Sequence, residues 1–419
     1  MARAAAKTMK IDSAEAAVLE ELAAAAPTGR EAEDVAVAAE DGSVRALSLR
    51  FRGLASLPES LGRLRELTEL DLTGNRLSDL PRSIRDLSML RSIRLDDNCL
   101  RTVPHSLEGL GDLRELHLDE NQLASLPASI GRLSQLETLH ARANGLRSVP
   151  ETIGELHALR DLSLANNRLT SVPESLWRLT RLELLNFAGN RLSTLPAGVG
   201  ELQSLRMLDL GENELSSLPE TLGDLTDLSG YLYLSYNRLT SIPSSLGKLV
   251  DLRYLNITHN ELTSLPDALG NLTSLQELRL YNNRLAALPK ALGKLTNLRE
   301  LHLWSNELAS IPDSVGDLAS LRELQLRDNR LTALPESLGS LTRLSILDLR
   351  NNRLTALPDS LGNLHSLTRL DLRANRLLSL PAGIGDLPNL EKLDLRWNKL
   401  GAEPAWIGRL EERGCAVLR

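Results

Sequence analysis

A proline recurs every 23 residues along most of this chain, and the period constrains the fold more than any other feature. Sixteen of the eighteen prolines are in this register, and the one different spacing is the 24 residues between Pro219 and Pro243. Each period reads approximately LxxLxLxxNxLxxLPxxLGxLxx, as residues 344–364 illustrate. A repeat of this length indicates a single solenoid, although 419 residues could otherwise form two or three ordinary domains.

The two halves of the motif predict different local structures. In LxxLxL, leucines two residues apart point to the same side of an extended strand, and the residues between them face solvent. In LPxxLGxL, the three-residue apolar spacing after a proline predicts a 3₁₀ or short helical turn. Because one coil cannot bury its own leucines, neighbouring coils must stack. We therefore expect an α/β solenoid with a parallel β-sheet on one face and 3₁₀ or short helical turns on the other.

The motif resembles the leucine-rich-repeat superfamily, and the LPxxLGxL half is most similar to its 23-residue intracellular class. That class includes plant Ras-group repeat proteins, animal Ras-pathway scaffolds and many bacterial proteins. The resemblance covers about residues 44 to 412 and implies a curved horseshoe or arc of about 16 coils, with the strands on the concave face. It also implies a common role in protein recognition and signalling. A small GTPase partner is suggested by the resemblance alone.

The motif of that family contains an asparagine, which corresponds to one residue in each of fifteen coils of this chain. A buried amide is tolerated only when it is hydrogen-bonded, and here it can bond the backbone of adjoining coils. We therefore predict a structural role, and no binding role, for this ladder. Its members are Asn75, Asn98, Asn121, Asn144, Asn167, Asn190, Asn213, Asn237, Asn260, Asn283, Asn306, Asn329, Asn352, Asn375 and Asn398.

Both ends of the chain depart from the motif in ways that predict caps. Residues 1–43 are expected to form an N-terminal helical cap, in which Asp12 and Glu15 suit a capping box and Asp41 with Gly42 suits a hairpin turn. Residues 44–412 form the repeat domain, and residues 413–419 are expected to add a C-terminal capping strand. End coils need such caps because they would otherwise expose the leucine core.

Composition excludes several classes of function. The net charge of −7 argues against nucleic acid as a main partner, because binding phosphates needs a basic surface. The sequence has no 18-residue apolar run and no apolar segment of a secretory signal, so we expect neither a membrane span nor this route of export. Two distant cysteines, Cys99 and Cys415, indicate no disulfide framework or zinc site and favour a reducing, cytoplasmic location. Export without such a signal stays open, and a monomer is favoured.

Signatures of catalysis are absent from the sequence, including the phosphate-binding loop, HExxH and GxSxG. Some bacterial leucine-rich-repeat effectors carry a ubiquitin-ligase domain with a cysteine nucleophile, but no room for such a domain follows the repeats. We therefore expect neither an enzyme nor a cofactor. His117 and His140 occupy the same outward position in successive coils, yet two histidines are more often surface groups than ligands, so no metal is predicted.

The outward residues between the strand leucines point to a partner-binding surface in the middle coils. All five tyrosines fall there, and Trp304 continues the row in the next coil. Tyrosine and tryptophan are typical anchors of protein interfaces. A stack that only stabilises the sheet and a site for a sugar or other small ligand are the alternatives. The predicted residues are Tyr231, Tyr233, Tyr236, Tyr254, His259, Tyr281, His302 and Trp304, and a bulge near Gly230 could re-aim the tyrosines.

Later coils carry a secondary charged surface. It consists of Arg327, Arg350, Arg373 and Arg396, beside Asp348, Asp371 and Asp394. Arginines and aspartates in this arrangement can satisfy one another across strands, so mutual pairing is the favoured interpretation.

Taken together, these patterns predict a non-catalytic protein-interaction module that binds a protein partner on its concave face. Three alternatives are a bacterial effector that binds host proteins, a carbohydrate-binding protein, and an enzyme of the ubiquitin-ligase type.

Overall fold

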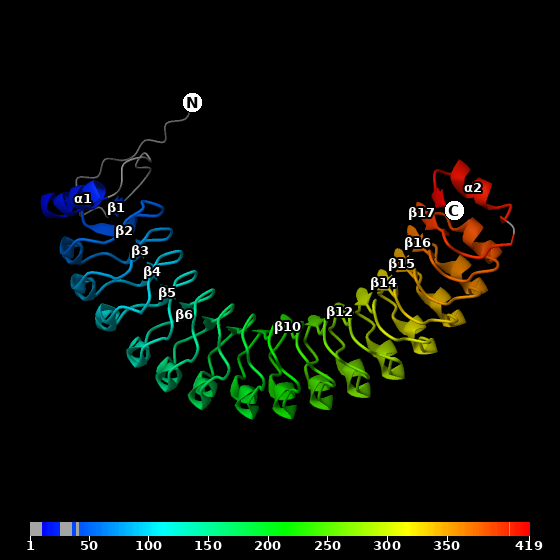
Figure 1. Ribbon diagram of the computed structural model, residues 1–419, viewed down its shortest axis with the longest axis horizontal. Helices are drawn as coiled ribbons and strands as arrows, with labels where there is room; N and C mark the ends of the chain where they lie inside the picture. Colours follow the sequence, from blue (N-terminus) through cyan, green and yellow to red (C-terminus); the bar gives the residue numbers. More distant parts are fainter. Residues whose placement is uncertain (1–10, 26–35, 39–41, 402) are drawn as a thin grey trace. The chain divides into compact units, whose positions relative to one another are not determined.

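The computed structural model describes residues 11–25, 36–38, 42–401 and 403–419, and the chain divides into two compact units, Met1–Leu192 and Ser193–Arg419. Each unit is a stack of coils in which one short strand is followed by one 3₁₀ helix. Within each unit, the strands line the inner side and the 3₁₀ helices lie on the outer side (Figure 1). The predicted parallel sheet and helical turns are therefore confirmed.

In the first unit, β1 pairs antiparallel with β2, and the strands from β2 to β8 pair parallel, each with the next. The helix is α1 (Ser13–Ala25), and the strands are β1 (Ala36–Ala38), β2 (Val44–Ser48), β3 (Glu69–Asp71), β4 (Ser92–Arg94), β5 (Glu115–His117), β6 (Thr138–His140), β7 (Asp161–Ser163) and β8 (Leu184–Asn186). The 3₁₀ helices are η1 (Glu59–Arg63), η2 (Arg82–Asp86), η3 (His105–Gly109), η4 (Ala128–Arg132), η5 (Glu151–Glu155) and η6 (Glu174–Arg178).

In the second unit, the strands from β9 to β18 all pair parallel, each with the next. They are β9 (Met207–Asp209), β10 (Tyr231–Tyr233), β11 (Tyr254–Asn256), β12 (Glu277–Arg279), β13 (Glu300–His302), β14 (Glu323–Gln325), β15 (Ile346–Asp348), β16 (Arg369–Asp371), β17 (Lys392–Asp394) and β18 (Ala416–Leu418). The helices are η7 (Ala197–Glu201), η8 (Glu220–Asp224), η9 (Ser244–Lys248), η10 (Asp267–Asn271), η11 (Lys290–Lys294), η12 (Asp313–Asp317), η13 (Glu336–Ser340), η14 (Asp359–Asn363), η15 (Ala382–Asp386) and α2 (Ile407–Glu412).

Leucines at the motif positions form the core of each unit. In the coil of β12, Leu278 and Leu280 are fully buried, whereas Glu277 and Arg279 of the same strand are only partly buried. The motif proline precedes each 3₁₀ helix in extended conformation, as at Pro266 with φ −71° and ψ 146°. Proline holds φ near this value and lacks an N–H that the first helical turn would leave unpaired, so it sets the start of the helix.

The ladder asparagines tie each coil to the one before it. For example, the side-chain oxygen of Asn306 accepts a hydrogen bond from the N–H of Leu285 at 3.0 Å, and its amide nitrogen donates to the carbonyls of Leu280 and Leu303 at 3.0 Å. These bonds satisfy backbone groups where the chain turns away from the strand, and the amide itself is buried. The asparagines therefore have a structural role.

The N-terminal helix is capped in a way that differs from the predicted capping box. The carboxylate of Asp12 accepts a hydrogen bond from the N–H of Ala14 at 3.2 Å, as a cap should. Glu15, however, accepts a hydrogen bond from the N–H of Val44 at 2.7 Å, and the N–H of Asp12 donates to the carbonyl of Gly42. Glu15 thus connects α1 to the first coil instead of closing a capping box. Asp41 of the predicted turn lies outside the described residues.

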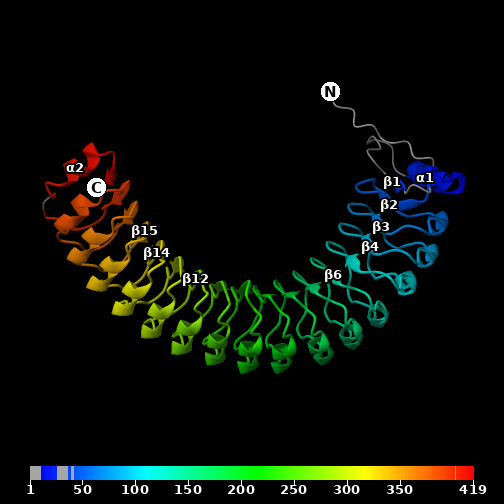
Figure 2. The same ribbon diagram turned by 180° about the vertical axis from the view of Figure 1, so that it is seen from behind.

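Helix α1 lies at the N-terminal end of the stack of coils in the first unit, and helix α2 lies at the C-terminal end of the stack in the second unit (Figure 2). In the first unit, α1 contacts η1 and buries Val18 and Leu22. In the second unit, α2 contacts η15 and buries Ile407 and Leu410, and β18 adds the last parallel strand beside β17. Each helix covers leucines of the adjacent end coil that would otherwise face solvent.

The irregular coil accommodates its extra residue at Gly230, just before β10. β10 pairs with β9 at two positions, Leu232 with Leu208 and Tyr233 with Asp209, where regular neighbours pair at three. A Cβ atom at Gly230 would lie 2.7 Å from Cγ of Met207 and 3.0 Å from the carbonyl oxygen of Arg206, so a larger residue there would require the Met207 side chain to move. The local change in pairing lies where the sequence predicted a bulge.

Candidate functional site

The predicted aromatic residues lie in four consecutive coils of the second unit, and the structure divides most of them into two groups. The first group, which we name the strand cluster, consists of Tyr231 and Tyr233 on β10 and Tyr254 on β11. The ring centroids of Tyr231 and Tyr233 are 4.7 Å apart, and those of Tyr233 and Tyr254 are 5.0 Å apart. All three side chains are partly exposed on the strand face.

The second group follows the strands and forms a continuous stack, which we name the ring row: Tyr236, His259, Tyr281 and Trp304. Tyr236 stacks on His259 with ring centroids 3.9 Å apart, and Tyr281 stacks on Trp304 at 4.0 Å. His259 meets Tyr281 edge-on at 5.4 Å. Tyr236 is 52% exposed, so the row presents an accessible aromatic face.

The ring row continues into the row of arginines. The guanidinium of Arg327 lies 4.3 Å from the ring centroid of Trp304, within cation–π range. The sequence predicts the aromatic and charged surfaces as separate zones, but this contact joins them. The joined surface combines flat rings with a cation at one end.

Burial shifts the pKa of two of these side chains, His259 and Tyr254. Burial lowers the pKa of His259, and its Nε2 lies 2.6 Å from the amide nitrogen of Asn282. Burial also raises the pKa of Tyr254, although the guanidinium of Arg279 lies 5.4 Å from its ring centroid and opposes the shift. Both shifts favour the uncharged side chain.

His302 is placed with acidic groups instead of in the ring row. Its Nε2 lies 3.2 Å from a carboxylate oxygen of Glu300 and 4.0 Å from one of Glu277. Within the described residues, this is where three possible metal-ligand groups gather, with ligand atoms within 4.8 Å of one another. Arg279 also forms an ion pair with Glu277, so a cation would have to compete with that guanidinium. The absence of a metal therefore stays a prediction.

The arginines of the secondary charged surface pair with aspartates on the strands. Arg373 lies 2.6 Å from Asp371 and 3.2 Å from Asp394, and Arg396 lies 2.7 Å from Asp394. Asp394 is 1% exposed. Burial alone would raise the pKa of Asp394, but hydrogen bonds from Arg396 and the charges of Arg373 and Arg396 together lower it.

Arg327 and Arg350 share the remaining aspartate of this surface. Their nearest nitrogens lie 3.6 and 3.7 Å from Asp348, and burial raises the pKa of that carboxyl. These contacts agree with the interpretation that the arginines and aspartates satisfy one another.

Two residues of this face, Arg279 and Trp397, were not predicted from the sequence. Arg279 lies between the strand cluster and the acids at His302. Trp397 is 72% exposed, with the guanidinium of Arg396 lying 5.6 Å from its ring centroid. Trp397 occupies the position before the ladder asparagine, as Tyr236 and His259 do, and tabulating that position coil by coil could have found it.

The other candidates for chemistry are arranged less favourably. The rings of His117 and His140 are 5.0 Å apart, and His140 lies 3.1 Å from Asp161. Cys99 is partly exposed, whereas Cys415 is buried and burial raises the pKa of its thiol, which disfavours the nucleophilic thiolate. Among the residues that the structure describes, no helix is long and apolar enough to cross a membrane.

Comparisons with known proteins point to one family. The model of the leucine-rich repeat region matches residues 89–189, 232–328 and 310–403, more than half of the chain, and the model of the single leucine-rich repeat matches residues 66–87. A search of curated protein sequences gave no significant match.

Solved structures give the same result. A leucine-rich-repeat protein of Leptospira interrogans is 36% identical, with a TM-score of 0.81 over 88% of this chain and 94% of that one. A plant peptide hormone receptor, RGFR1 in complex with RGF2, is 32% identical, with a TM-score of 0.77 over 90% of this chain. The chain spans 66% of that receptor structure. The repeat, the coil geometry and these matches together show that the chain belongs to the leucine-rich-repeat family.

Proposed function

We propose that this chain is a non-catalytic interaction module that binds a protein partner through the strand cluster and the ring row of its second unit. The partner segment would lie across consecutive strands, where the outward side chains of several coils can contact it at once. The function requires no covalent step, because shape, ring contacts and hydrogen bonds provide the binding energy.

One observation carries this proposal, namely the unbroken contact from Tyr236 through His259, Tyr281 and Trp304 to Arg327. Tyrosine, tryptophan and arginine are the residues most enriched among side chains that dominate interface energies. Here they come from successive coils and are partly exposed, so a partner could cover them together.

Two further observations support a protein partner over a stack that only stabilises the sheet. The scaffold already has its own stabilising devices, the buried leucines and the asparagine ladder, which recur in coils without aromatic rings. Related structures of this family include a plant peptide hormone receptor in complex with RGF2. A curved row of strands therefore suits an extended peptide or the surface of a small domain.

The finer expectations stay predictions. A small GTPase partner rests on the resemblance to Ras-pathway scaffolds, and a cytoplasmic location rests on the two cysteines, which are far apart in the sequence. An effector that binds host proteins would use the same surface, and a translocation assay would distinguish it.

A capture experiment tests the proposal. The native chain and the combined variant Tyr233→Ser, Tyr254→Ser, Tyr281→Ser and Trp304→Ser are used as bait in a lysate of the source cells, and captured proteins are identified by mass spectrometry. We expect a protein that the native chain retains and the combined variant loses. Since single interface anchors often contribute about 2 kcal/mol, even two of these losses would weaken binding by roughly a thousandfold.

Trp397→Ser provides the matched control, because it removes an exposed ring outside the two groups. Circular dichroism must show that all three chains fold equally well. Equal capture of the same partner by the native chain and the combined variant would refute the aromatic site. Failure of both to retain any protein, together with binding of the native chain to a glycan array, would favour the carbohydrate alternative.

A further inference from the structure

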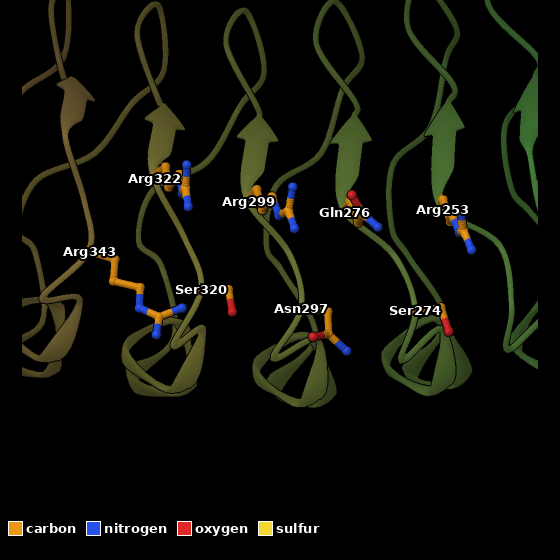
Figure 3. A pocket seen from close by; sticks show the side chains of 8 residues that line it. All are labelled: Arg253, Ser274, Gln276, Asn297, Arg299, Ser320, Arg322 and Arg343. Atoms are coloured by element: carbon orange, nitrogen blue, oxygen red, sulfur yellow. The ribbon is translucent and has the colours of Figure 1, made fainter.

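A pocket of about 420 Å³ lies on one flank of the second unit, away from the ring row, where the chain passes from the 3₁₀ helices to the strands. Figure 3 shows Arg253, Gln276, Arg299 and Arg322 in a row at the starts of successive strands. Ser274, Asn297 and Ser320 lie nearer the 3₁₀ helices, and Arg343 comes from the next coil. All eight lining side chains are polar.

The pocket has a strong excess of positive charge. Four of its lining residues are arginines, and none is acidic. Within the part of the chain that the structure describes, none of these four guanidiniums forms an ion pair or a side-chain hydrogen bond. All four arginines are exposed, so their charges are available to a ligand.

At the same repeat position of the first unit, just before the strand, two arginines are neutralised by glutamates of the next coil. There Arg114 pairs with Glu137 at 2.9 Å, and Arg160 pairs with Glu183 at 2.6 Å. In the first unit, arginine and glutamate alternate at this position from Arg114 to Glu183. In the second unit, Gln276 stands in the coil after Arg253, where the alternation would place a glutamate. Arg299 and Arg322 then occupy the position in the next two coils. In the four coils from Arg253 to Arg322, the second unit therefore keeps the arginines of this pattern without its glutamates.

Acidic residues next in sequence do not compensate the pocket, because each has a partner on the strand face. Glu277 pairs with Arg279, Glu300 lies beside His302, and the carboxylate of Glu323 accepts a hydrogen bond from Gln325 at 2.8 Å. Successive residues of a strand point to opposite sides, so these side chains reach along the strand to the residue two positions ahead. The arginines before them stay unpaired.

From this arrangement we propose that the flank pocket binds a small ligand carrying two or more phosphate groups. Guanidinium is the side chain best matched to phosphate oxygens, and serine and asparagine side chains can add further hydrogen bonds. A single small anion would not engage arginines spread over several coils, because parallel strands are about 4.8 Å apart. The uniformly polar lining offers no surface for an aromatic base.

Isothermal titration calorimetry on the full chain provides the test, with orthophosphate, pyrophosphate and tripolyphosphate as probes at physiological ionic strength. We expect saturable binding that strengthens in that order. The double variant Arg299→Gln with Arg322→Gln should weaken tripolyphosphate binding on the order of tenfold or more. Gln276→Glu should also weaken it, because it restores an acidic group while keeping every arginine.

The matched control is Arg114→Gln with Arg160→Gln, which removes two arginines from the same repeat position in the first unit, where they are already paired. This control should bind tripolyphosphate like the native chain. An equal loss in the control, equal affinity for all three probes, or no saturable binding would overturn the proposal. A single-stranded oligonucleotide that binds more tightly than tripolyphosphate would overturn it in favour of nucleic acid. Partner capture by the ring row is expected to be unaffected by these variants.

Discussion

At the position just before the strand, the first unit (Met1–Leu192) and the second unit (Ser193–Arg419) use the same repeat differently. The first unit pairs Arg114 with Glu137 and Arg160 with Glu183, whereas the second leaves Arg253, Arg299 and Arg322 without an acidic partner. The backbone is the same in both cases. The two arrangements differ only in whether the outward side chains satisfy one another, and our two binding proposals rest on that difference.

The strand faces differ in the same way. In the first unit, His140 is bonded to Asp161, and Asp119 accepts the N–H of Arg142 at 2.6 Å. In the second unit, the outward positions carry rings that stack on one another and still expose an edge or face. Polar groups that satisfy each other gain little from a partner, but exposed rings gain the free energy of burial. This difference is the reason that we propose the second unit as the part that binds a partner.

Substitution of a ladder asparagine should have the largest effect on stability, and the effect should be equal in the two units. Asn167→Ala and Asn306→Ala each remove a buried amide that bonds four backbone groups. We expect each variant to lower the free energy of unfolding by about 2 to 4 kcal/mol, because buried backbone groups lose their partners. Urea denaturation followed by circular dichroism measures this, and a large difference between the two variants would break the assumption of a common scaffold.

Much of this scaffold could be predicted from the sequence because each coil uses short-range rules. The alternation around Leu278 and Leu280 places a strand, Pro266 starts a helix, and a buried Asn283 must find backbone partners. These features depend on neighbours in the same or the adjacent coil. The 23-residue period predicts these neighbours, because residues 23 apart in the sequence occupy equivalent positions in adjacent coils.

Contacts that depend on side-chain torsions could not be predicted in the same way. The stacking of Arg327 on Trp304 joins two surfaces that looked separate, and Glu15 bonds Val44, 29 residues away, in place of its own helix end. Likewise, the outward position of His302 did not reveal that its ring would meet Glu300 instead of the tyrosines. The period gives register, but it does not give the direction in which a long side chain turns.

The next largest effect is expected at a buried aspartate of the second unit, Asp394, compared with its counterpart in the first unit, Asp71. Asp394 in the second unit and Asp71 in the first occupy the same repeat position, but Asp394 is held by two arginines at 3.2 and 2.7 Å, whereas Asp71 lies 3.6 Å from Arg50. We expect Asp394→Asn to cost about 1 to 3 kcal/mol of unfolding free energy and Asp71→Asn to cost less. Equal costs in urea denaturation would contradict this.

The pH dependence of that effect has a defined sign. Because the folded pKa of Asp394 is lowered, its stabilisation is present above the unfolded value of about 3.9 and is lost as pH falls through the folded pKa. Asp394→Asn should therefore show its cost at neutral pH and lose it in acid.

The coupling between rings is expected to be smaller. A double-mutant cycle on Tyr281→Ala and Trp304→Ala should give an interaction energy of about 0.5 to 1.5 kcal/mol in the free chain, as for other stacked pairs. Partner binding should fall much more, as measured by titration with the captured protein. A coupling of several kcal/mol with unchanged binding would favour the interpretation that the stack only stabilises the sheet.

The smallest expected effect is the pH dependence of stability that arises from two histidines, one in each unit, whose pKa values are shifted in opposite directions. The hydrogen bond to Asp161 raises the pKa of His140, whereas burial lowers that of His259. The stabilisation by His140 is therefore present below about pH 6.5 and lost as pH rises through its folded pKa, while His259 destabilises the fold as pH falls below about 6.5. NMR titration should find His140 protonated at a pH where His259 is neutral, and Asp161→Asn should lower the pKa of His140 alone.

Hydrogen–deuterium exchange of the native chain, with and without its captured partner, tests the assignment of recognition to the second unit most directly. We predict that binding protects peptides containing Tyr233, Tyr254, Tyr281 and Trp304, while strands β3 to β7 of the first unit exchange as before. Protection confined to the first unit or to the 3₁₀ helices, with the ring row unchanged, would contradict that assignment.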